Sequence, residues 1–319
     1  MTHVFVTGGT GVLGRPVVRS LVAQGHRVRV LAHSPESERT IRQLGAEPVQ
    51  ANLFDPATLS QAVGDADAVL HLATRIPPSN KMGKAESWAE NDRLRTEGTR
   101  NLVDAALAGP VQTFIYPSVV LVYPDSGADW IDAQSTQPDP IAVVRSTMDA
   151  EAQVRRFAEA ARRGITLRMG SFYGPESAHI RDMLAYARKG VAAVLGPGAA
   201  YQSCIWIEDA ARAVVVALDK APSGTYDVVD DEPLQRSELV SLIAHAAGKE
   251  RLWRLPGFLM SVMLGKDLVA VNSRSQRVSN RAFRQATGWA PQVPSARQGW
   301  RRLAETSSAV LGQQHLVTG

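Results

Sequence analysis

The sequence predicts an α/β protein that is built on a doubly wound parallel sheet and ends in a smaller, mainly helical region. Two observations support this fold class. Short apolar runs alternate with amphipathic helical stretches through residues 1–172, an alternation typical of parallel strands joined by crossover helices. The first apolar run leads directly into a glycine-rich turn, TGGTGVLG at residues 7–14, which is typical of a strand that turns sharply into a helix.

The expected strands of the first half are short stretches of apolar and β-branched residues. In chain order they cover residues 4–7, 27–32, 46–51, 68–72, 113–117 and 166–169. Helices are expected between them, at residues 13–24, 36–44, 56–63, 87–108 and 143–163. The last helix carries an apolar stripe at spacings of four, three and four, which fits a helix lying on a sheet: Ala150, Val154, Phe157 and Ala161.

The second half has a less regular pattern, with helices expected near 180–189, 208–219 and 236–248 and a strand at 226–229. The stretch 255–271 is rich in Leu and Met but contains Lys266 and Asp267, so it is too short and too charged to cross a membrane. We expect it to be a flexible substrate lid, since Met fills irregular space; a core helix and a dimer contact are the alternatives. The polar stretch 75–88 is expected to form a loop over the site.

The composition excludes several classes of function. Lys and Arg number 35 against 31 Asp and Glu, and no basic block is present, so nucleic acid is not an expected partner. The single cysteine, Cys204, allows neither an intrachain disulfide nor a Cys-x-x-Cys metal site, which fits a reducing cytoplasm. No apolar run reaches the roughly 18 residues of a membrane span. We expect a cytoplasmic protein without metal or membrane partner, with a homodimer as an open alternative.

The glycine turn carries the pattern of a dinucleotide-binding site. Gly8 allows the tight turn, Gly11 lets the backbone approach a pyrophosphate, and Gly14 lets the helix pack closely on the strand. Val12 and Leu13 open the helix, whose N-terminus faces the phosphates. The sequence therefore predicts a Rossmann-type region at residues 1–172 and a substrate-capping region at 173–319, which together form one compact unit.

Several segments together resemble one family. They are TGGTGVLG (7–14), VLHLAT (69–74), EGTRNLVDAA (97–106), FIYPSVVLVY (114–123), LRMGSFYGP (167–175), IWIEDAARA (205–213), TYDVVDDEPL (225–234) and SNRAFRQATGWAP (279–291). These segments are similar to the extended short-chain dehydrogenases/reductases, the epimerase/dehydratase group. The resemblance implies an NAD(P)-binding enzyme in which Leu72, Ala73 and Thr74 lie beside the cofactor ribose.

The end of the second expected strand bears on the choice between NAD and NADP. An acidic residue there would accept hydrogen bonds from the ribose of NAD, but this chain has His33 and Ser34. We expect them to meet a 2′-phosphate and therefore favour NADP, with a solvated turn as the alternative. By the resemblance, Asn52 and Leu53 lie beside the adenine.

The catalytic residues of the resembled family are missing. That family places a Ser on a strand and a Tyr and a Lys four residues apart on a helix; alignment puts these positions on Val119, Val143 and Thr147. No local shift restores the pair, because no Tyr occurs in residues 124–172 and no Lys in residues 85–188. The sequence thus predicts an atypical member that lacks the Tyr-Lys proton relay.

Other groups are candidates for the missing chemistry. Ser118 is the nearest hydroxyl to the lost Ser position, with a structural role as its alternative. Ser146 and Thr147 are expected to face the same cavity, and Thr147 to keep a ribose hydrogen bond. Tyr173 is expected on the nicotinamide side, and His179 at the helix that lines the substrate cavity, where a histidine could titrate near neutral pH; a surface histidine at a helix start is the alternative for His179. A further set of residues is assigned no chemistry: His71 is expected to be structural, and Asp149 and Glu151 to be solvated charges.

Three functions remain open at this point. The first is an enzyme that transforms a small, rather apolar organic substrate of specialised metabolism by a non-redox cleavage, isomerisation or cyclisation. The second is an NADP-dependent carbonyl reductase whose proton comes from another donor. The third is a nucleotide-binding regulator without turnover. Val119 and Val143 favour an enzyme with an apolar pocket wall beside the cofactor.

Overall fold

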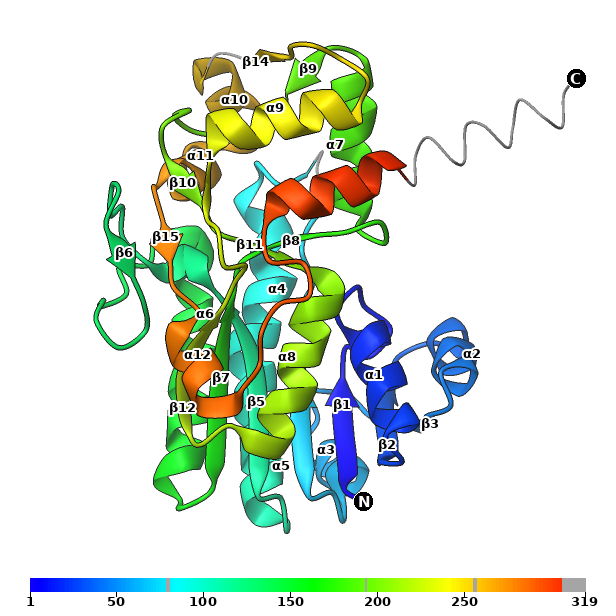
Figure 1. Ribbon diagram of the computed structural model, residues 1–319. Coiled ribbons are helices and arrows are strands. Elements are labelled where there is room, and N and C mark those ends of the chain that lie inside the picture. Colours follow the sequence, from blue (N-terminus) through cyan, green and yellow to red (C-terminus); the bar gives the residue numbers. More distant parts are fainter. Residues whose placement is uncertain (79–80, 193, 255–256, 306–319) are drawn as a thin grey trace, which may run out of the picture.

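The computed structural model describes residues 1–78, 81–192, 194–254 and 257–305 and contains a seven-stranded parallel sheet (Figure 1). The strand order is β12-β7-β5-β4-β1-β2-β3, with β4 at the centre and the chain order reversing between β1 and β4, as in a doubly wound topology. The strands are β1 (His3–Thr7), β2 (Arg27–Ala32), β3 (Glu47–Gln50), β4 (Ala68–His71), β5 (Thr113–Val119), β7 (Arg163–Met169) and β12 (Gly224–Val228). This arrangement confirms the predicted fold class.

Helices cover both faces of the sheet, and strand residues alternate between two cores. Val4 and Val6 of β1 join one core, whereas Phe5 between them joins the other, as the period of two in a strand requires. The first core is covered by α1 (Gly14–Ala23), α2 (Pro35–Gln43), α8 (Ile207–Lys220) and α12 (Arg281–Thr287). The second is covered by α3 (Pro56–Val63), α5 (Thr99–Ala108) and α6 (Ala142–Glu159).

The second half of the chain contributes to both layers of the molecule. Strand β12 pairs with β7 in parallel, and α8 packs against α1, so parts of the chain beyond residue 172 complete the sheet layer. The remaining elements gather beyond the carboxyl ends of the strands, at the top of Figure 1. They include α7 (Ala178–Arg188), β9 (Val191–Ala192), α9 (Arg236–Ala246), β14 (Trp253–Arg254), α10 (Gly257–Leu264) and α11 (Lys266–Ser273).

Short paired strands connect these two parts of the molecule. They are β6 (Trp130–Ile131), β8 (Ser171–Tyr173), β10 (Tyr201–Gln202), β11 (Cys204–Trp206), β13 (Leu234–Gln235) and β15 (Arg277–Val278). Among them, β8 and β11 pair in parallel directly after β7 and before α8. The chain therefore leaves the sheet at β8 and returns to it through β11.

The expected helix 87–108 and the expected lid 255–271 are each divided in the structure. The predicted helix 87–108 is a 3₁₀ turn (Ala85–Trp88), α4 (Ala89–Arg93), a π-helical segment (Leu94–Gly98) and α5. The predicted lid 255–271 is split into α10 and α11 by Gly265, at φ +82°, while residues 255–256 lie outside the described residues. A Cβ on Gly265 would lie 3.2 Å from the Gly83 carbonyl oxygen, so the segment predicted as a lid meets the predicted loop 75–88 here.

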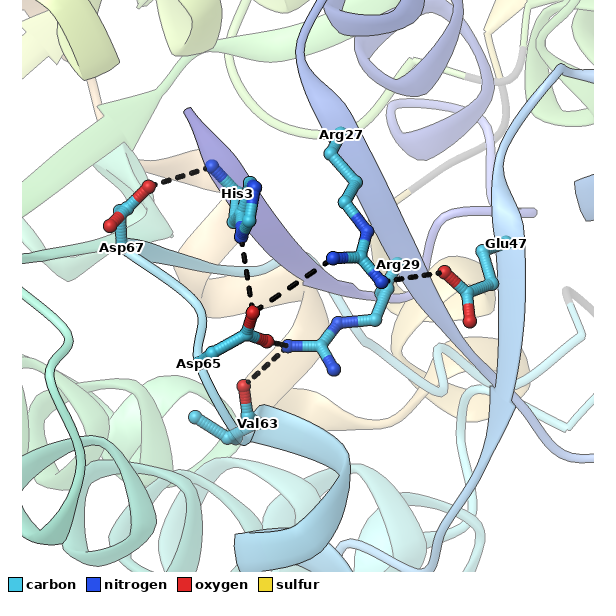
Figure 2. A network of polar contacts seen from close by, with 7 residues as sticks. All are labelled: His3, Arg27, Arg29, Glu47, Val63, Asp65 and Asp67. Atoms are coloured by element: carbon cyan, nitrogen blue, oxygen red, sulfur yellow. Dashed lines mark hydrogen bonds and ion pairs between the residues drawn. The ribbon is translucent and has the colours of Figure 1, made fainter. Parts of the chain in front are cut away.

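An ionic network ties the amino ends of the strands together (Figure 2). Asp65, which precedes β4, pairs with Arg29 at 2.7 Å and with His3 at 3.3 Å, and the Arg29 charge holds its pKa below the usual value. Arg27 reaches Glu47 at 3.6 Å. This network lies at the end of the sheet opposite the glycine turn, so its role is structural. No helix within the described part of the chain is long and apolar enough to cross a membrane.

Candidate functional site

The three glycines of the turn meet different surroundings. Gly8 has φ +71°, and a Cβ on it would lie 2.6 Å from the backbone of Ala73. A Cβ on Gly14 would lie 2.1 Å from the Gly8 carbonyl oxygen, so this glycine is needed for packing within the turn. Gly11 is exposed, and its nearest neighbour would be the Gly8 oxygen at 3.2 Å. Only Gly11 therefore leaves open surface where a phosphate could approach the backbone.

The first turn of α1 lies beside this surface. Leu13 is buried and anchors the helix, whereas Val12 is 38% exposed. The segment Gly14–Val17 carries no acidic side chain, so the positive end of the helix dipole is not neutralised by a carboxylate of this turn. These residues fit a dinucleotide, because open backbone and an uncompensated helix N-terminus are what a pyrophosphate needs.

The residues expected around the adenosine half lie at the carboxyl ends of β2 and β3. His33 is exposed directly after β2, and the Ser34 hydroxyl caps α2 by accepting from the Ser37 amide at 3.2 Å. The exposed Asn52 accepts from the Phe54 amide at 3.0 Å in a tight turn. Leu53 is buried beside it.

The segment after β4 lies against the glycine turn, as the family resemblance implies. The Leu72 amide donates to the Thr7 carbonyl at 3.1 Å, and Ala73 meets Gly8. Thr74 is exposed at the rim. The structure thus places all the expected cofactor segments along one edge of the sheet.

The three positions of the missing catalytic groups come from β5 and α6. Val119 ends β5 and Val143 lies in the first turn of α6, and both are half-buried. Thr147, one turn further, is fully buried, and its Oγ1 has no hydrogen-bond partner among the described residues. A buried hydroxyl without a partner is costly, and a ribose hydroxyl of a bound nucleotide would satisfy it.

Ser118 is held in a buried polar network. Its hydroxyl donates to Glu151 Oε1 at 2.5 Å, and Glu151 forms two hydrogen bonds with Arg168, at 3.0 and 2.8 Å. The Arg168 guanidinium lies over the Tyr123 ring, and the Tyr123 hydroxyl donates to Asp227 at 2.8 Å.

Burial controls the charges of this network. It raises the pKa of Asp227 to about 7, although hydrogen bonds from Tyr123 and the Ala133 amide oppose the rise. Glu151 is only 1% exposed, so the expectation of a solvated charge at this residue was wrong. It follows Thr147 by four residues and so faces the same buried side of α6, a spacing that could have revealed it.

Tyr173 lies in the core of the capping region. Its hydroxyl donates to Asp230 Oδ2 at 2.9 Å, and its ring packs edge-on against Trp206. Only 2% of Tyr173 is exposed, and burial raises its pKa far above the usual value. The hydroxyls of Tyr173 and Ser118 are therefore both committed to buried carboxylates.

The other candidates lie in different settings. His179 is exposed at the start of α7, although desolvation by the surrounding protein lowers its pKa. The Ser146 hydroxyl donates to Asp92 Oδ1 at 2.7 Å. His71 is buried between Thr7 and Thr99, and burial lowers its pKa to about 4, in keeping with a structural role. Within the described ranges no group of His, Cys, Asp and Glu is arranged to hold a metal ion.

Comparison with known proteins identifies the family. The family model "NAD dependent epimerase/dehydratase family" matches residues 4–229. The chain belongs to this family. Its members are named for NAD, which agrees with the open surface at Gly11.

Curated relatives match almost the whole chain. A 3-diazoavenalumate denitrifying reductase from a Streptomyces species is 31% identical, over 94% of this chain and 99% of its own. A 2-alkyl-3-oxoalkanoate reductase from Stenotrophomonas maltophilia is 28% identical, over 96% and 99%. Among solved structures, a human epimerase family protein, SDR39U1, crystallised with NADPH, superimposes with a TM-score of 0.78 at 22% identity, over 95% and 99%. This last likeness confirms the fold.

Proposed function

We propose that this protein is a reductase that transfers hydride from NADPH to a small organic acid bearing an aryl diazonium group and releases dinitrogen. The proposal combines the nucleotide site with the similarity to a denitrifying reductase that extends over nearly the full length of both chains. Both reductases compared above act on substrates that are named as carboxylates.

The observation that carries the proposal is the loss of all three proton-relay residues, at Val119, Val143 and Thr147. Reduction of a carbonyl leaves an alkoxide that must be protonated, and a positioned acid contributes about 10²–10⁴ in rate. Reduction of a diazonium group needs no proton. Hydride brings an electron pair that forms the new C–H bond, the C–N bond breaks, and its electrons leave with dinitrogen.

The remaining candidate donors agree with chemistry that needs no protein acid. Ser118 and Tyr173 already donate to Glu151 and Asp230. His179 is exposed at the start of α7, where we place it at the substrate entrance rather than at the reacting atoms. The half-buried Val119 and Val143 would form an apolar wall that excludes water from the reduced nicotinamide.

The cofactor preference is part of the proposal. His33 follows β2 as an exposed side chain, and Arg39 is exposed on α2. Either can face a 2′-phosphate, whereas no carboxylate follows β2 directly to hold the ribose of NAD. We expect NADPH to bind more tightly than NADH, and His33→Asp to reverse the order.

The test follows three products at once. The purified protein is incubated without oxygen with NADPH deuterated at C4 and an aryl diazonium carboxylate. We expect one NADPH oxidised per dinitrogen released, with deuterium in the new C–H bond. Product formed without NADPH oxidation and without deuterium would support the non-redox alternative. A 3-oxo acid serves as the comparison substrate; if it is reduced faster than the diazonium, the argument from the missing acid fails.

A further inference from the structure

Three buried polar groups come together where the helix of residues 89–98 packs on α6. Asn91 and Thr147 are fully buried, and Arg95 is 6% exposed. Each has an atom without a hydrogen-bond partner among the described residues: Asn91 Nδ2, Arg95 Nε and Thr147 Oγ1. Buried polar atoms are nearly always satisfied in folded proteins, so a cluster of exceptions points to a ligand.

The π-helical segment that carries Arg95 packs on α6, the helix that carries Thr147. The bond between Asp92 Oδ1 and Ser146 Oγ joins α4 to α6 at 2.7 Å. Both helices run from the carboxyl to the amino ends of the strands, because each connects two parallel strands. Arg95 lies three residues beyond Asp92, and Thr147 directly follows Ser146, so both lie further along their helices, towards the amino ends of the strands.

The sheet side of the cluster is marked by Tyr116 of β5. Burial raises the pKa of this phenol, the Arg95 charge opposes the rise, and Glu151 adds to it. Arg95 and Glu151 therefore both lie close to Tyr116, and Thr147 is one turn before Glu151 on α6. Arg95 also belongs to the π-helical segment, a distortion that is frequent at functional sites.

The guanidinium of Arg95 lacks a counter-charge among the described residues. The nearby carboxylates are committed elsewhere, Asp92 to Ser146, Glu97 to Arg93 at 2.7 Å, and Glu151 to Arg168. A buried cation is costly unless it is paired, so its site favours a ligand rich in oxygen. Arginine stays charged in any such setting, unlike lysine.

We propose that Arg95 supplies, from a different helix, the positive charge that the family places at position 147, and that Arg95, Thr147 and Asn91 together bind the ribose hydroxyls at the nicotinamide end of the cofactor. This inference rests on the proposed function only for the use of a nicotinamide cofactor. It explains why the chain does not need the lysine. The positive charge comes from Arg95 on the facing helix, and the shorter Thr147 side chain leaves room for it.

The test relocates the charge and measures binding of NADPH itself, by quenching of protein fluorescence. Arg95→Met should weaken binding about tenfold or more, since hydrogen bonds to a charged group are the strong ones. Thr147→Lys alone should lower the melting temperature of the nucleotide-free protein, because it places a second cation beside Arg95. The double variant should regain NADPH binding to within a few-fold of wild type and melt above Thr147→Lys.

Two controls keep the outcome clear. Arg100→Met removes an exposed arginine of α5 and should change neither binding nor melting. Arg95→Lys keeps the charge and should bind NADPH within a few-fold of wild type, which covers the case in which Arg95→Met does not fold. Independent effects of the two sites, or wild-type binding by Arg95→Met, would overturn the proposal. The predicted reduction of the diazonium substrate can fail while these variants behave as expected, because the comparison of single and double variants measures only NADPH binding and stability.

Discussion

Replacement of Thr147 by Val should make the nucleotide-free protein more stable and its cofactor binding weaker. The two side chains have nearly the same shape, and both are β-branched, so helix propensity and packing in α6 change little. The substitution removes a fully buried hydroxyl that has no hydrogen-bond partner among the described residues.

The magnitude follows from the energetics of buried polar groups. An unsatisfied buried donor or acceptor costs about 1–3 kcal/mol, and this is the stabilisation expected from Thr147→Val in the absence of nucleotide. In the complex the same hydroxyl would contribute about 0.5–1.5 kcal/mol as a hydrogen bond. Because the substitution also removes the cost of about 1–3 kcal/mol from the free protein, the thermodynamic cycle gives a loss of about 1.5–4.5 kcal/mol in binding free energy, so the dissociation constant should rise at least about tenfold.

The assay is urea unfolding with and without NADPH, together with a binding titration. Thr147→Ser is the matched control, because it keeps the hydroxyl but loses a buried methyl group, and it should be less stable by about 1 kcal/mol while binding is retained. A nucleotide-free Thr147→Val protein that is less stable than wild type would show that the hydroxyl is satisfied, and unchanged NADPH binding would remove Thr147 from the cofactor site.

Three further predictions test the turn, the buried network and its protonation. Gly14→Ala should impair folding because its Cβ would meet the Gly8 oxygen at 2.1 Å, whereas Gly11→Val should fold and lose NADPH binding; circular dichroism and titration separate the two. Glu151→Gln should cost about 3–5 kcal/mol in unfolding free energy, since it leaves buried Arg168 unpaired. Burial raises the pKa of Asp227 from 3.8 unfolded to about 7 folded, so its contribution to stability is complete below the unfolded value and is lost as pH rises to about 7. Relative to Asp227→Asn, wild type should therefore lose up to about 1.4 kcal/mol of stability per pH unit across that range, and a constant difference would contradict the raised pKa.

The fold could be predicted because its determinants are local. Alternation of apolar runs and amphipathic helices fixes a parallel sheet, and each of the six strands expected in the first half is present within a few residues of its expected ends. The π-helical segment Leu94–Gly98 was not predicted, since one regular helix was expected through residues 87–108.

The polar partners of the site could not be predicted in the same way. Ser118 and Glu151 are 33 residues apart, and Tyr173 and Asp230 are 57 apart, so each pair exists only after the sheet has formed. The sequence shows that a hydroxyl is available but not that it already donates a hydrogen bond to a buried carboxylate. A candidate list based on residue type and neighbourhood therefore includes hydroxyls that the folded chain has already used.

The same reasoning explains why Arg95 escapes a search for the missing lysine. A motif search looks for a cation on one helix, four residues from the tyrosine position, and finds Val143 and Thr147. Chemistry requires only that a positive charge reach the nicotinamide ribose, and the packing of residues 89–98 on α6 offers a second helix from which it can do so. Loss of the Tyr-Lys motif is thus evidence against proton donation by a tyrosine, and not against a positive charge at the nicotinamide ribose. If Arg95 carries that charge, the chain has separated the two roles of the Tyr-Lys pair, because it keeps the cation that binds the cofactor and lacks the acid that protonates the product. Hydride transfer to a diazonium group requires this combination, since that group is already electrophilic and its reduction needs no proton.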